Sequence, residues 1–171
     1  MNKRLGIEFY CQDVLEVAPR LLGKHLIRIY PDGTKAAYVI SETEAYRGEE
    51  DLACHASKGR TPRTEVMFGD GGHLYMYLIY GMYWMLNVVT GNKDVPQAVL
   101  FRGLCEASGP GRLTRLIRVD KDFYGEDLVK SDRIWVEESG TRPQYTAGPR
   151  IGIDYAGEPW KDMPWRFLLK L

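Results

Sequence analysis

The sequence predicts an α+β fold: a single domain, residues 1–171, on a curved, mainly antiparallel β-sheet flanked by short helices. Three observations support this prediction. Segments rich in β-forming residues follow one another with turn residues between them, and only two short segments have a helical pattern. With 171 residues, of which 44% are hydrophobic, the chain is long enough to bury one sizeable core.

The first predicted element is a short helix between Asp13 and Gly23. Asp13 is a favourable N-cap, and glycine is typical just past a helix end. Pro19 lacks the backbone N–H that a helix interior needs, so we expect the regular part to begin near Ala18.

A β-hairpin is expected next. Lys24–Tyr30 and Lys35–Tyr46 have the composition of strands, and Pro31–Gly33 is a turn sequence between them. Arg47–Gly72 is dense in Gly, Pro and charged residues, which predicts a long loop. Loops of that length within a compact domain are usually functional or disordered.

A second hairpin follows, with strands at His73–Ile79 and Met82–Thr90 and a bend near Tyr80. Ala98–Arg102 continues the sheet. Gly109–Gly111 then opens a predicted helix over Arg112–Arg118. The remaining strand candidates are Arg133–Glu137, Arg150–Asp154 and Trp165–Leu169.

Composition excludes several classes of protein. No apolar run is long enough to cross a bilayer, and the N-terminus lacks the apolar stretch of a signal peptide. The three cysteines have no CxxC spacing, which argues against a disulfide framework or a zinc site. We therefore expect a cytoplasmic protein without membrane association.

The charges balance, with 23 Lys plus Arg and 23 Asp plus Glu, whereas a DNA-binding domain is usually basic. Phosphate contacts nevertheless need only local positive charge. Basic residues gather in two groups: Lys58, Arg60 and Arg63, and then Arg112, Arg115 and Arg118.

Carboxylates lie at the end of the second predicted strand. Glu42, Glu44 and Tyr46 share one face, because side chains alternate along a strand. Strand-end carboxylates are most often solvated, but this pair also fits a metal ligand set or a two-carboxylate glycosidase. His55 follows closely enough in sequence to join the same site, although a lone histidine in a polar loop is most often a surface group.

The tyrosines and one arginine allow two interpretations each. Aromatic residues on a strand usually belong to the core. Tyr75 and Tyr77 share a face opposite Met76 and Leu78, so one of these two pairs must face away from the main core or into a cavity. Tyr80 at the bend is difficult to bury and suits insertion into a base stack. Arg102, at the end of an apolar strand, is either a paired structural residue or part of the site.

Taken together, these residues resemble the alkyladenine (3-methyladenine) DNA glycosylase family over nearly the whole chain. Several motifs in the same order make the resemblance more specific than any one of them. The motifs lie at Glu42–Tyr46, Thr61–Arg63, Met67–Phe68, Tyr77–Tyr83 and Arg150–Gly152.

The resemblance implies a role for each matching residue. Glu44 matches the general base, and Arg102 an arginine that helps position the water and the nucleotide. Tyr46, His55 and Tyr77 match the pocket for the flipped base. Asn87 matches a substrate-binding asparagine that crowds the exocyclic amine of guanine, and Tyr80 matches the wedge. The other expected DNA-binding residues are Met82 and Tyr83 on the same hairpin and the basic residues Arg63 and Arg112.

The expected activity is that of a monofunctional, monomeric DNA glycosylase. It would flip alkylated or deaminated purines (the 3-methyladenine, hypoxanthine and ethenoadenine class) out of double-stranded DNA and hydrolyse the glycosidic bond, leaving an abasic site. No cofactor or metal is expected. The alternatives are a non-catalytic binder of distorted nucleic acid and a carbohydrate-directed glycosidase that uses Glu42 and Glu44.

Overall fold

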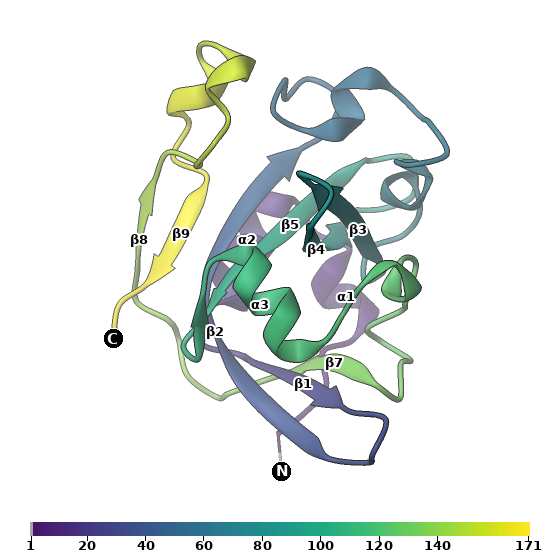
Figure 1. The fold of residues 1–171 in the computed structure, drawn as a ribbon. Helices are drawn as coiled ribbons and strands as arrows, with labels where there is room; N and C mark the ends of the chain where they lie inside the picture. Colours follow the sequence, from purple (N-terminus) through teal and green to yellow (C-terminus); the bar gives the residue numbers. More distant parts are fainter. Residues whose placement is uncertain (1) are drawn as a thin grey trace.

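The computed structural model describes residues 2–171, and in this range nine strands form one sheet (Figure 1). The strands are β1 (His25–Ile29), β2 (Lys35–Arg47), β3 (Leu74–Ile79), β4 (Tyr83–Thr90), β5 (Gln97–Leu104), β6 (Ala107–Ser108), β7 (Ile134–Glu137), β8 (Tyr145–Gly148) and β9 (Arg166–Leu169). The main order is β3-β4-β5-β2-β1-β7, while β6 pairs with β5 and β9 pairs with both β2 and β8. All these pairings are antiparallel.

Three helices and five short 3₁₀ turns complete this part of the chain. The helices are α1 (Ile7–Tyr10), α2 (Val14–Leu21) and α3 (Pro110–Ile117). The turns are η1 (His55–Lys58), η2 (Glu65–Phe68), η3 (Lys121–Phe123), η4 (Asp154–Ala156) and η5 (Trp160–Asp162). Within residues 2–171, no helix has both the length and the apolar character that crossing a bilayer requires.

The long strand β2 organises the sheet. On one edge, residues 35–39 pair with β1 and residues 42–44 pair with β9, while β5 pairs along the other edge. The register against β5 is irregular between Ile40 and Thr43, which marks a bulge where the neighbour changes. Glu44 therefore lies in the part of β2 that pairs with β5 and β9, beyond the part that pairs with β1.

The two faces of β2 have different neighbours. Thr43 donates a hydrogen bond from its hydroxyl to the carbonyl of Ala18 at 2.9 Å, so this face packs against α2. Figure 1 shows α1 and α2 behind the sheet and α3 in front of it. Glu44 and Tyr46 alternate with Thr43 along the strand and therefore face the side of the sheet opposite α2.

The predicted fold class and most strands are confirmed within one or two residues of their bounds, as is the helix α3. The prediction that the regular helix begins only near Ala18 was wrong. Helix α2 continues through Pro19 and has Asp13 as its N-cap. Pro19 lies in the last turn, where burial of its ring beside Val17 and Leu21 offsets the one missing amide bond.

The strand predicted at Arg150–Asp154 was also wrong, because this segment is irregular and ends in η4. Gly152 adopts a positive φ of 75°, and the Arg150 side chain is drawn into a buried ion pair, so the segment bends away from a ladder. The strand lies just before it, as β8. The short elements α1, β6 and β8 were not predicted.

Candidate active site

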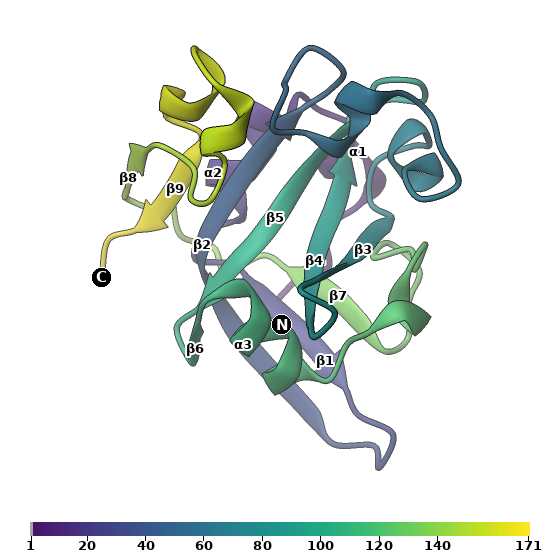
Figure 2. The ribbon, with the colours of Figure 1, turned by 45° about the horizontal axis from the view of Figure 1, so that its top comes forward.

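A pocket of about 510 Å³ opens on the side of the sheet opposite α2. Its walls come from the ends of β2 and β5, the β3–β4 hairpin, the entry of α3, and the loops that contain η1 and η4. Figure 2 shows those two loops side by side above the sheet, and the hydroxyl of Tyr155 donates to the carbonyl of Ala53 at 3.3 Å between them. The pocket has the size of ordinary small-ligand sites.

Nine of the eleven side chains singled out from the sequence line this pocket. They are Glu44, Tyr46, His55, Tyr77, Tyr80, Tyr83, Asn87, Arg102 and Arg112. Met82 lies instead at the exposed tip of the hairpin. Arg63 is exposed and lies outside the pocket lining, with its guanidinium 5.5 Å from the ring centre of Tyr77.

Glu44 is a fully buried carboxylate in this pocket. Its Oε1 accepts a hydrogen bond from the Tyr46 hydroxyl at 2.9 Å, and its Oε2 accepts one from the backbone N–H of Ile151 at 2.7 Å. Burial raises the pKa of Glu44, while Ile151, Arg102 and Tyr46 act in the opposite direction. The side chain is thus held in one orientation with an increased affinity for a proton.

Arg102 joins the two carboxylates of β2. Its Nε lies 3.3 Å from Glu42 Oε1, and its Nη1 lies 3.8 Å from Glu44 Oε1. Arg166 also binds Glu42, at 3.0 Å. Glu42 is therefore the structurally paired carboxylate and lies outside the pocket lining, so the two acids do not flank a common substrate space as a two-carboxylate glycosidase requires.

An aromatic wall stands on the other side of the pocket. The Tyr75 hydroxyl lies 2.7 Å from His55 Nδ1, and the His55 and Tyr77 rings lie 4.5 Å apart. Burial, with Arg63 and Lys58 nearby, lowers the pKa of His55 to about 4. His55 is therefore a neutral imidazole at pH 7, with one donor and one acceptor nitrogen.

Asn87 fixes one side of the pocket. It is buried on β4, and its Nδ2 donates to the Tyr75 carbonyl at 3.2 Å. Because that bond holds the amide, the side chain presents a rigid surface to any bound ring.

Tyr80 is the most exposed aromatic side chain in residues 2–171, with 88% of its surface accessible. Tyr80 and Gly81 both adopt positive φ, 54° and 64°, and Met82 donates its N–H to the Ile79 carbonyl at 3.1 Å. These values define the tight hairpin turn that matches the twist of the two strands. A non-glycine residue at positive φ is uncommon, so the turn holds an aromatic ring outward at some conformational cost.

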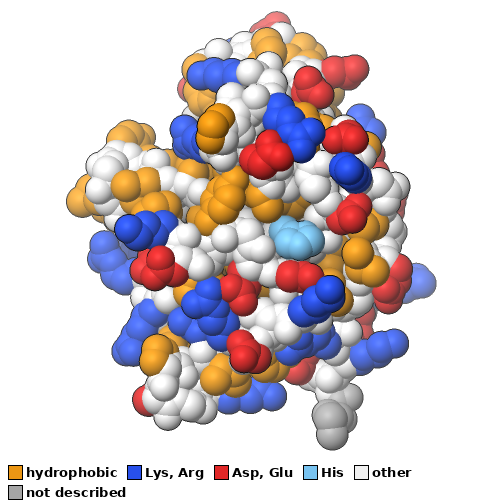
Figure 3. Space-filling model, turned by 90° about the vertical axis from the view of Figure 1, so that its right-hand side faces the viewer, with side chains coloured by type: hydrophobic (Ala, Val, Ile, Leu, Met, Phe, Trp, Pro, Cys, Tyr) orange, Lys and Arg blue, Asp and Glu red, His pale blue; other side chains and the backbone are white. Residues whose placement is uncertain are grey.

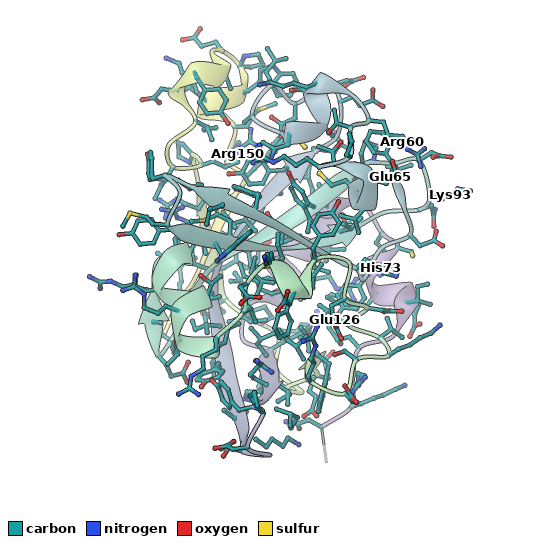
Figure 4. The ribbon with its side chains drawn as sticks, turned by 45° about the vertical axis from the view of Figure 1, so that its right-hand side comes forward. Arg60, Glu65, His73, Lys93, Glu126 and Arg150 are labelled. Carbon is teal, nitrogen blue, oxygen red and sulfur yellow. The ribbon has the colours of Figure 1, made fainter. Side chains whose placement is uncertain are left out.

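The basic residues of the two groups noted in the sequence differ in their partners. Arg60 is bound by Glu65 at 2.7 Å and lies 3.5 Å from Asp94, and Figure 4 shows Arg60 and Glu65 side by side. Among residues 2–171, no carboxylate lies within ion-pair distance of Lys58, Arg63, Arg112 or Arg115. The side of the molecule drawn in Figure 3 carries interspersed acidic and basic side chains. Of these four basic side chains, Arg112 lies in the pocket lining.

Sequence reasoning missed part of the site. The backbone of Ile151 and the exposed ring of Tyr155 both lie at the pocket, and Asp51 pairs with Arg150 beside Tyr46, outside the pocket lining. The motif Arg150–Gly152 was the one local signal for this segment. Within residues 2–171, no three His, Cys, Asp or Glu side chains gather as a possible metal site.

The methylpurine-DNA glycosylase family model matches residues 8–107 and 104–171. The chain belongs to this family. Three relatives are each named "Putative 3-methyladenine DNA glycosylase". The one from Methanocella arvoryzae is 44% identical over 94% of this chain and 89% of its own. Those from Desulfitobacterium hafniense and Legionella pneumophila are 43% and 44% identical over 98% of this chain and 96% and 95% of theirs.

Family membership confirms the resemblance inferred from the motifs. The protein is a DNA glycosylase, a hydrolase of N-glycosyl bonds. A binder without catalytic activity and a carbohydrate-directed enzyme are thereby excluded as its main role. In this methylpurine-DNA glycosylase, the pocket can hold a planar ring against the buried carboxylate of Glu44.

Proposed function

We propose that this DNA glycosylase flips an alkylated or deaminated purine out of duplex DNA and hydrolyses its N-glycosidic bond, leaving an abasic site. The substrate class comprises 3-methyladenine, hypoxanthine and ethenoadenine. The observation that carries the proposal is the buried Glu44 carboxylate in an aromatic pocket large enough for a purine. The name that these relatives share supports the first of these bases.

Glu44 is proposed as the general base. Breaking the glycosidic bond builds positive charge on the sugar, which a nearby carboxylate stabilises while it accepts the proton of the attacking water. The raised pKa of Glu44 favours that proton transfer at neutral pH. Arg102, which lies near both Glu44 and the pocket, is proposed to position the water and the nucleotide.

The aromatic wall is proposed to hold the flipped base. Tyr46 and Tyr77 offer ring faces for stacking, and neutral His55 offers hydrogen bonds without charge. Extrusion of a base costs a few kcal/mol, and least for a damaged or mispaired one. Tyr80, with Met82 and Tyr83 on the same hairpin, is proposed to fill the gap left in the duplex and so offset part of that cost.

Hydrolysis without strand cleavage is also proposed. Among the described residues, the pocket lining contains no lysine that could form a Schiff base with the sugar. We further propose that the protein acts as a monomer, without a cofactor, on chromosomal DNA inside the cell.

The decisive experiment compares the wild-type protein with Glu44→Gln on a duplex that contains one hypoxanthine. The amide keeps the shape of the site but cannot accept the proton, so we expect excision to be lost and binding of the lesion duplex to be kept. Excision within a few-fold of the wild-type rate would remove Glu44 from this role and direct attention to Glu42, for which Glu42→Gln is the matching variant. Product strands that break without alkali treatment would contradict simple hydrolysis.

A further inference from the structure

The most deeply buried ion pair in the described chain lies outside the pocket lining but beside Tyr46, a residue that lines the pocket. The side chains of Asp51 and Arg150 are both completely inaccessible to solvent. Arg150 Nη1 lies 2.6 Å from Asp51 Oδ2, and Nη2 lies 3.0 Å from Oδ1, so the pair is bidentate. Such a pair is desolvated on both sides and depends on its geometry to offset that cost.

Both partners bind further backbone groups. Asp51 also accepts hydrogen bonds from the N–H groups of Arg47 and Ala53, each at 3.0 Å. Arg150 also donates to the carbonyls of Ala45 at 3.0 Å and Trp160 at 3.2 Å. The pair therefore ties the end of β2, the loop after it and the segment that leads to η5 into one rigid unit.

Aromatic rings hold the guanidinium in place. The Arg150 guanidinium carbon lies 4.9 Å from the ring centre of Tyr46 and 4.9 Å from that of Trp165. Tyr46 is the same residue whose hydroxyl binds Glu44. The ion pair thus supports both hydrogen-bond donors of the Glu44 carboxylate, one through Tyr46 and one through the peptide that follows Arg150.

That peptide is the link to the reaction. The N–H of Ile151, one bond from Arg150, donates to Glu44 Oε2 at 2.7 Å. The next residue, Gly152, adopts a positive φ of 75°, so the segment has no regular secondary structure of its own to fix this N–H. The position of the Ile151 N–H is set instead by the anchored side chain beside it.

We infer that Asp51 and Arg150 are positioning residues for Glu44, whose ion pair holds the Ile151 N–H on the carboxylate. The inference rests on the proposed role of Glu44 as general base. It assigns a catalytic consequence to two side chains that lie outside the pocket and touch no substrate.

The charged and titratable groups that face Glu44 are Tyr46 and Glu42 on β2, Arg102 on β5, Tyr77 on β3, Tyr155 on η4 and, through Glu42, Arg166 on β9. Burial raises the pKa of Glu44 and the Ile151 N–H lowers it. Loss of that hydrogen bond stabilises the protonated form. Because the base must be ionised, the acid limb of the pH–rate profile then moves to higher pH.

The test uses Arg150→Lys, which keeps the buried positive charge but not the bidentate geometry, and Asp51→Asn, which keeps the shape of the side chain. Release of 3-methyladenine from methylated duplex DNA is measured under single-turnover conditions from pH 4.5 to 9. This base is already cationic and needs no proton to leave, so the acid limb reports on the general base. We expect an upward shift of about one pH unit, with recovery of the rate at high pH.

Arg133→Lys is the control. It weakens another arginine–carboxylate pair, in which Arg133 Nε and Nη2 lie 3.1 Å and 2.6 Å from Glu126 Oε2, outside the pocket lining; Figure 4 shows Glu126 well below Arg150. The control should lose stability without any shift of the acid limb. Variants of Asp51 and Arg150 that lower the rate equally at every pH, or match Arg133→Lys, would overturn the positioning role.

Failure of the proposed function gives a different result. If Glu44→Gln retained excision, Glu44 would not be the base, whatever the Asp51 and Arg150 variants did. If Glu44→Gln were inactive and the two variants kept the wild-type acid limb, only the positioning role would fall.

Discussion

His55 Nδ1 and the Tyr75 hydroxyl lie 2.7 Å apart in the wall of the pocket. The histidine is held there as a neutral ring because burial lowers its pKa to about 4, with Arg63 and Lys58 contributing. A polar group kept neutral within an aromatic wall suits recognition of an uncharged or cationic base. The lowered pKa of His55 also makes the stability of the fold depend on pH.

This link predicts a pH dependence of stability. Folding lowers the pKa of His55 from 6.5 to about 4, so the unfolded chain binds more protons between these values and stability falls as pH falls through this window. Between pH 7 and pH 5 the contribution is about 2 kcal/mol. His55→Asn should lose less stability over this range in urea unfolding. Glu44 contributes with the opposite sign, but equally in both proteins. Parallel pH curves for the two proteins would contradict the prediction.

Tyr80→Ala should weaken binding of a lesion duplex by about tenfold, since aromatic contact with a base contributes on the order of 1–3 kcal/mol. The rate of excision should fall more for well-paired lesions than for mispaired ones, because the wedge offsets the cost of extrusion. Tyr145→Ala, which removes an exposed tyrosine outside the pocket lining, is the control. Equal losses on both substrates would mean that Tyr80 does not act as a wedge.

Asn87→Ser should raise the release of guanine-type bases relative to hypoxanthine. The Asn87 amide is fixed by its bond to the Tyr75 carbonyl, so it cannot move away from an exocyclic amine, whereas serine leaves that space free. The ratio of the two release rates is measured within one variant, which cancels any general loss of activity. An unchanged ratio would place the discrimination at another residue.

Non-specific DNA affinity should fall steeply with salt despite the zero net charge, because each phosphate contact contributes about 0.9 to the slope of log affinity against log salt. Arg63→Ala should reduce that slope by about one. Arg60→Ala should reduce it less, because Glu65 already binds the Arg60 guanidinium. Titrations of one duplex at several salt concentrations compare the two variants. A flat salt dependence of the wild-type protein would show that no phosphate-binding face exists.

Local patterns predicted the strands and turns well. The alternation at Glu44 and Tyr46 correctly indicated one shared face, and their side chains are hydrogen-bonded. The turn at Tyr80 was also predicted from the sequence, because glycine at positive φ and flanking β-formers are local signals. The effect of Pro19 was predicted wrongly, because burial of its side chain in the core outweighed the low helix propensity of proline.

The sequence by itself determined the fold class, the family and the residue types of the candidate site, because each depends on short-range periodicity or on motifs within a few residues. Only the tertiary structure decided how those residues are paired. Glu42 is neutralised by Arg102 and Arg166, whereas Glu44 receives an N–H from Ile151, 107 residues away. Asp51 and Arg150 are 99 residues apart. Such contacts depend on the path of the whole chain around the sheet, and no local pattern of side chains encodes that path.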